Sequence, residues 1–174
     1  SLVSYLKALF GKDIRVFVPQ IAMSAGTMIA LSSKEIIMGK QSNLGPIDPQ
    51  FGGMSCAGII EEFNEACSDV KANPEMARVW GPIISKYHPT FIGDCKKAMT
   101  WADTIVNKWL TENMFSAYTD AEARARKVVD ALSSHNATYS HSRHIHIDEL
   151  NNLGLKIVPL ERLDDRQIDD CKDL

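Results

Sequence analysis

The sequence lacks a long hydrophobic run, a cysteine pair at metal or redox spacing, and an excess of basic residues. Its longest apolar stretches fall far short of the about 20 residues that a membrane-spanning helix needs, and nothing in it resembles a signal peptide. The four cysteines show no C-x-x-C spacing, which excludes a zinc-ribbon or thioredoxin signature. The formal net charge is −3, whereas nucleic-acid-binding domains are usually strongly basic. We therefore expect no nucleic-acid partner, and reduced thiols as in the cytoplasm.

Signatures of cofactors and metals are also missing. The chain has no Gly-x-Gly-x-x-Gly motif and no lysine in a recognisable pyridoxal-phosphate context, so no cofactor is expected. His141, His144 and His146 form a His-x-x-His-x-His run. Histidines on a polar loop are more often solvated than bound to a metal, and we expect no metal site.

What the chain does contain is an alternation of helix and strand. Its 174 residues, 45% of them hydrophobic, suffice for one domain with its own core. The first 40 residues or so predict helix, strand, helix and strand, over 2–10, 14–18, 24–31 and 35–39. This order favours an α/β fold, in which crossover helices connect the strands of a parallel sheet.

The second part of the chain is predicted to be largely helical. Turn-forming residues dominate 42–53, and helical periodicity follows over 57–72, 75–87, 94–116 and 120–132. A short helix over 148–153 and a last strand over 155–160 complete the domain. We place the domain at residues 1–163 and a charged tail at 164–174.

Ser24 is the residue whose placement indicates chemistry. A strand ends near Val18, a sharp connection follows, and the serine opens a helix. The first N–H groups of a helix have no intrahelical partner and carry partial positive charge. The Ser24 hydroxyl is therefore placed to attack a carbonyl, with the Ala25 N–H directed at the oxyanion that forms. The alternative is that Ser24 only caps the helix, because serine is among the commonest N-caps.

Three segments together resemble a known family of peptidases. They read PQIAMSAGTMIAL at 19–31, EIIMG at 35–39 and LGPIDPQ at 44–50. They are similar to the serine dehydrogenase proteinase family of the Clp/crotonase superfamily, which is related to signal peptide peptidase A. The likeness is dense over 12–53 and looser up to residue 155. It implies a Clp/crotonase-like fold, a serine peptidase activity, Ser24 as nucleophile and Ala25 as oxyanion donor.

The general base is less well defined. Clp protease keeps a histidine where this chain has Asp48, and a carboxylate is too weak a base for serine. Signal peptide peptidase A uses a serine–lysine dyad, in which burial must lower the lysine pKa. Lys86 fits that position, although the helper serine of the peptidase is absent from the Gly45–Asp48 turn. His88 and His141 remain as alternatives.

The resemblance carries further expectations. The second oxyanion donor of the superfamily precedes the first helix of this chain. We therefore expect the N-terminal part of the domain to be missing and the fragment alone to be inactive. A peptide or protein substrate and a homo-oligomer are implied, with any membrane association made by parts outside this chain. The competing hypotheses are a crotonase-type acyl-CoA enzyme and an inactive ring-forming scaffold.

Overall fold

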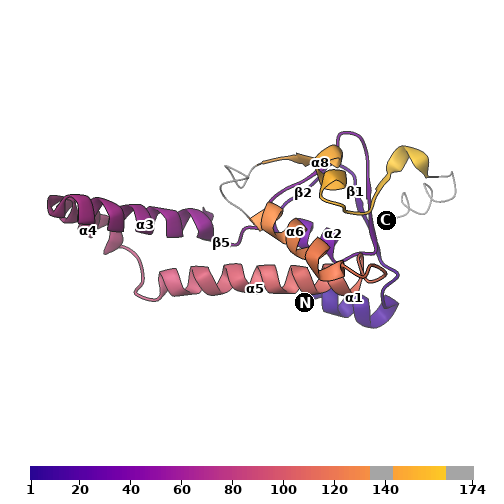
Figure 1. The fold of residues 1–174 in the computed structure, drawn as a ribbon, viewed down its shortest axis with the longest axis horizontal. Helices are drawn as coiled ribbons and strands as arrows, with labels where there is room; N and C mark the ends of the chain where they lie inside the picture. The colour runs from indigo at the N-terminus through magenta and orange to yellow at the C-terminus, as the bar shows by residue number, and fades with distance from the viewer. Residues whose placement is uncertain (134–142, 164–174) are drawn as a thin grey trace. The chain divides into compact units, whose positions relative to one another are not determined.

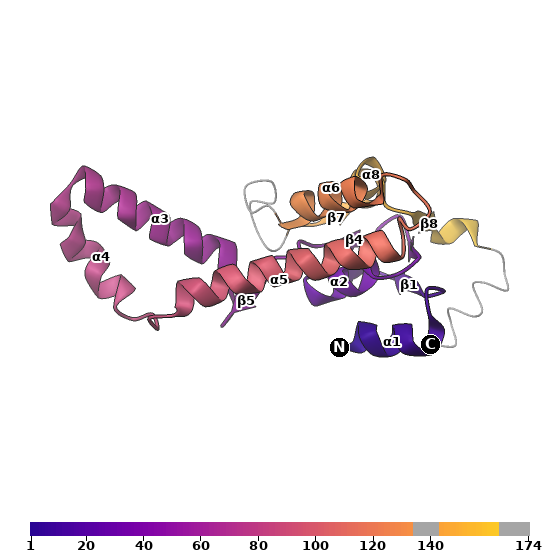
Figure 2. The same ribbon diagram turned by 60° about the horizontal axis from the view of Figure 1, so that its bottom comes forward.

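The computed structural model describes residues 1–133 and 143–163 of the chain. They divide into two compact units, one formed by residues 1–47, 103–133 and 143–163 and the other by residues 48–102. Figures 1 and 2 show the elements of both units. The first unit contains the strands of the parallel sheet, and the second is mainly helical.

The first unit is built around a three-stranded parallel sheet in the order β1-β3-β8. These strands are β1 (Arg15–Val18), β3 (Glu35–Met38) and β8 (Ile157–Pro159). The central strand is a nearly continuous apolar run, with Ile36, Ile37 and Met38 all buried, as expected for a parallel strand that is covered on both faces. The parallel sheet predicted from the helix–strand alternation is thus confirmed.

A second small sheet in the same unit has the order β2-β4-β7. β2 (Ile21–Ala22) runs parallel to β4 (Asn43–Leu44), and β4 runs antiparallel to β7 (Ile145–His146). Each of these strands has two residues. The sequence did not predict them, because two residues are too few to show a period.

Helices cover both sheets of the first unit (Figure 2). They are α1 (Leu2–Phe10), α2 (Ala25–Leu31), the end of α5 (Phe91–Glu112), α6 (Ala121–Ser133) and α8 (Ile147–Asn152), with a 3-10 turn at Leu160–Arg162. Their apolar faces share one core with the sheets, in which Leu31, Leu110 and Phe115 are fully buried.

The second unit consists of a small hairpin and helices. The hairpin pairs β5 (Gln50–Phe51) with β6 (Met54–Ser55), and the helices are α3 (Cys56–Ala72), a 3-10 turn at Pro74–Met76, α4 (Ala77–Ile84) and the start of α5. Ser55 caps α3 by accepting a hydrogen bond from the Gly58 N–H at 3.1 Å. The helix predicted over 75–87 is shorter in the structure: a 3-10 turn at Pro74–Met76 precedes α4, which ends at Ile84.

Candidate active site at Ser24

Ser24 occupies a strained turn between β2 and α2. Its dihedral angles are φ 47° and ψ −112°, and the Gly26 N–H donates to the Met23 carbonyl at 2.8 Å. These values describe a β-turn close to type II′ with Ser24 at its first central position, where glycine is strongly preferred. Among the described residues, Ser24 is the only one besides glycine with positive φ. Such a conformation costs on the order of 1–3 kcal/mol, and strain of this kind clusters at functional sites.

The Ser24 hydroxyl does not cap the helix that follows it. α2 starts at Ala25, and the Ser24 side chain makes no capping hydrogen bond to it. The residue is half-buried, so the hydroxyl is not enclosed in the core. The alternative in which Ser24 serves only as an N-cap therefore lacks the hydrogen bond on which it depends.

Ala25 supplies the backbone group expected beside the nucleophile. The residue is exposed, and no acceptor within residues 1–133 and 143–163 pairs with its N–H. An N–H group that follows the serine directly and has no protein partner is available to an oxyanion. The positive charge of a helix dipole adds little here, because α2 has only seven residues.

A loop after β4 holds the turn from the other side. The Ser24 N–H donates to the Pro46 carbonyl at 3.2 Å, and the Gly45 N–H donates to the Ala22 carbonyl at 2.8 Å. A Cβ atom at Gly45 would lie 2.2 Å from the Met23 sulfur, so the Met23 side chain would have to move to admit one. The sequence indicated a turn in this segment but not its contact with Ser24, which arises from hydrogen bonds between distant parts of the chain.

The candidate bases other than His141 lie in the second unit. Lys86 follows α4 in a turn and is exposed. His88 is exposed and its Nδ1 lies 3.1 Å from the Thr90 hydroxyl oxygen, at the start of α5. Asp48 is buried. His141 lies outside the described residues. Each of these assignments stays a prediction.

Within residues 1–133 and 143–163, no group of three His, Cys, Asp or Glu side chains is arranged to hold a metal ion. In the same residues, no helix is both long and apolar enough to cross a bilayer.

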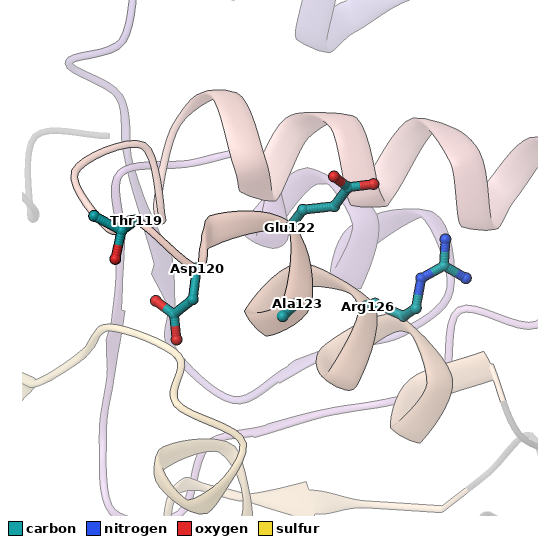
Figure 3. A pocket seen from close by; sticks show the side chains of 5 residues that line it. All are labelled: Thr119, Asp120, Glu122, Ala123 and Arg126. Atoms are coloured by element: carbon teal, nitrogen blue, oxygen red, sulfur yellow. The ribbon is translucent and has the colours of Figure 1, made fainter.

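One cavity in the first unit lies at the start of α6 (Figure 3). It has a volume of about 420 Å³ and is lined by Thr119, Asp120, Glu122, Ala123 and Arg126. The Asp120 carboxylate beside it accepts a hydrogen bond from Arg124 Nε at 2.8 Å. None of the residues that the sequence predicts for catalysis lines this cavity.

The parallel sheet and its connecting helices are those of an α/β protein, in which Ser24 stands in a strained turn between β2 and α2. A family model described as ClpP-like SDH-type serine proteinase matches residues 5–161. The chain belongs to this family, as the three resembling segments predict.

Two proteins of Methanocaldococcus jannaschii are similar to the chain, and both are described as uncharacterized. MJ1495 is 27% identical over 142 residues, which are 82% of this chain and 41% of that protein. MJ0137 is 28% identical over 145 residues, or 83% of this chain and 43% of that protein. The chain thus spans about two fifths of the length of these relatives. No solved structure matches it.

Proposed function

We propose that this chain carries the nucleophile of a serine peptidase and that Ser24 attacks the peptide bond. The observation that carries the proposal is the Ser24 turn, whose positive φ is unfavourable for a serine and whose hydroxyl does not serve as a cap. Membership of a serine proteinase family also supports the proposal that the chain is part of a peptidase.

The proposed reaction proceeds through an acyl-enzyme. The Ser24 Oγ bonds to the carbonyl carbon of the substrate while its proton passes to a general base. The negative charge on the carbonyl oxygen is stabilised by the Ala25 N–H. When the C–N bond breaks, the departing amine takes the proton from the base, and a water molecule then hydrolyses the ester.

Lys86 is the base that the resemblance to signal peptide peptidase A implies. A lysine accepts the serine proton only as the neutral amine, which burial favours. Lys86 is exposed, so in this proposal the bound substrate or another part of the protein covers it. A pH–rate profile tests this role: Lys86→Ala should abolish hydrolysis at every pH, whereas Lys71→Ala, an exposed lysine of the same unit, should retain the wild-type profile. Wild-type activity in Lys86→Ala would remove it from the mechanism.

Covalent labelling tests the nucleophile itself. A fluorophosphonate probe loses fluoride as its phosphorus bonds to an activated serine oxygen, and the adduct is located by peptide mass spectrometry. We expect labelling of the full-length protein at Ser24, loss of labelling in Ser24→Ala, and retained labelling in Ser85→Ala, which removes an exposed serine of the second unit.

The outcome also separates the alternative functions. Failure of the probe to label Ser24, together with hydration or hydrolysis of an acyl-CoA, would indicate a crotonase-type enzyme. Failure of labelling without such turnover would indicate an inactive scaffold. Either result would overturn the peptidase proposal.

A further inference from the structure

Thr27 lies one helical turn after Ser24 and joins three backbone groups through one hydroxyl. The side chain is fully buried in α2. Its Oγ1 lies within donating distance of the Ala22 carbonyl, at 2.8 Å, and of the Gly45 carbonyl, at 2.9 Å. The same oxygen accepts a hydrogen bond from the Gly45 N–H at 3.3 Å. Since a hydroxyl has a single proton, the two carbonyls share it.

These partners belong to the two segments that hold the Ser24 turn. Ala22 is the last residue of β2 and precedes Ser24 by two positions. Gly45 follows β4 and precedes Pro46, whose carbonyl accepts the hydrogen bond from the Ser24 N–H. The Thr27 hydroxyl therefore connects the strand that enters the turn with the loop that supports it.

The backbone pairing next to the turn is short, so the buried Thr27 side chain adds to it. β2 and β4 are paired over only two residues each. A serine with φ 47° keeps that conformation only where its surroundings determine it. A buried hydroxyl with several backbone partners supplies such a constraint, because any displacement of the loop would leave buried polar groups unpaired.

We propose that Thr27 is a positioning residue for Ser24: its hydroxyl fixes β2 and the Gly45–Pro46 loop relative to α2, and so directs the Ser24 hydroxyl at the substrate. This inference rests on the proposed function, because the position of Ser24 affects a reaction rate only if Ser24 is the nucleophile. It assigns a role to a side chain that does not itself contact the substrate.

Three substitutions test the proposal. Thr27→Val keeps the shape and removes the hydroxyl, and Thr27→Ser restores the hydroxyl without the methyl group. The matched control is Ser33→Ala, because Ser33 is also fully buried, follows the opposite end of α2, and has its hydroxyl near the Ala30 and Glu35 carbonyls at 2.6 and 2.9 Å. The control therefore deletes a comparable bridge far from the Ser24 turn.

The first measurement is the rate of fluorophosphonate labelling as a function of probe concentration, in the folded proteins at matched temperature. Misplacement of a reacting group by about 1 Å costs roughly 100-fold in rate. We expect the limiting rate to fall about 10- to 100-fold in Thr27→Val, with the half-saturating probe concentration little changed. Thr27→Ser and Ser33→Ala should stay within about threefold of wild type.

The second measurement does not need the reaction. Amide hydrogen exchange by NMR should be at least about tenfold faster for the Ser24 N–H in Thr27→Val than in wild type, and unchanged in Ser33→Ala, because local opening of the turn exposes this group. If wild type is not labelled, the proposed function fails and exchange alone decides the role of Thr27. The positioning role would be overturned if Thr27→Val were labelled and exchanged its Ser24 N–H at the wild-type rates. It would also be overturned if Ser33→Ala lost as much labelling rate and as much protection from exchange as Thr27→Val.

Discussion

Replacement of Ser24 by alanine and by glycine should change stability in a way that a helix cap would not. Ser24→Ala removes a hydroxyl that makes no capping hydrogen bond and leaves a Cβ atom at positive φ. We expect the free energy of unfolding to change by less than about 0.5 kcal/mol, whereas the loss of a true serine cap costs about 0.5–2 kcal/mol.

Ser24→Gly should stabilise the protein, because glycine adopts a φ of 47° without steric cost. Relief of backbone strain should raise the free energy of unfolding by about 1–3 kcal/mol. The greater conformational entropy of glycine in the unfolded chain should lower it by about 0.4–1 kcal/mol. The net gain should be about 1 kcal/mol. With a urea m-value of about 2 kcal/mol/M, this raises the unfolding midpoint by about 0.5 M.

The assay is urea unfolding of wild type and both variants, followed by circular dichroism, with Ala25→Gly as the matched control. Ala25 adjoins Ser24 but does not have positive φ, so glycine there should destabilise the protein by up to about 1 kcal/mol. Destabilisation by 1 kcal/mol or more in Ser24→Ala, or any loss of stability in Ser24→Gly, would refute the strained-turn interpretation.

Three further predictions concern other parts of the chain. Gly45→Ala should destabilise the protein by about 1–3 kcal/mol in urea unfolding and slow fluorophosphonate labelling, because its Cβ would displace the Met23 side chain. Burial raises the pKa of Cys56 to about 12, so native protein at pH 8 should react with iodoacetamide at the exposed Cys67 and not at Cys56 in peptide mass spectrometry. Burial also raises the pKa of Asp103, so its ionisation opposes folding, and Asp103→Asn should be more stable than wild type at neutral pH, with a difference in urea midpoint that shrinks in acid.

Each of these has a control and a contrary outcome. Gly39→Ala is the control for Gly45→Ala, since a Cβ atom at Gly39 would lie at an ordinary 3.4 Å from the Ser42 hydroxyl oxygen. If both variants lost the same stability, the close approach of Met23 to Gly45 would be contradicted. Alkylation of Cys56 at the rate of Cys67 would show that the thiol is not protected. An Asp103→Asn variant that gains stability as the pH falls, relative to wild type, would reverse the assigned sign.

Sequence patterns were sufficient for the longer elements of the molecule. Helices α3 and α6 start and end within one residue of the predicted ranges, because each has enough turns to show its period. The strands of the parallel sheet were also predicted, from short β-rich runs over 14–18, 35–39 and 155–160. Helix α5 was predicted over 94–116 and spans Phe91–Glu112, so the prediction began three residues late and ended four residues late. A periodic pattern indicates that a helix exists more reliably than where it ends.

The sequence alone places a serine between a strand and a helix, in surroundings that resemble a serine proteinase family. The conformation of that serine depends on contacts between segments that are distant in the chain. Its positive φ is held by the hydrogen bond that the Pro46 carbonyl accepts from the Ser24 N–H and by the contacts of Gly45 and Thr27. These groups lie near one another because two strands of two residues pair side by side. Such strands are too short to leave a periodic pattern, and their pairing depends on groups that are far apart along the chain.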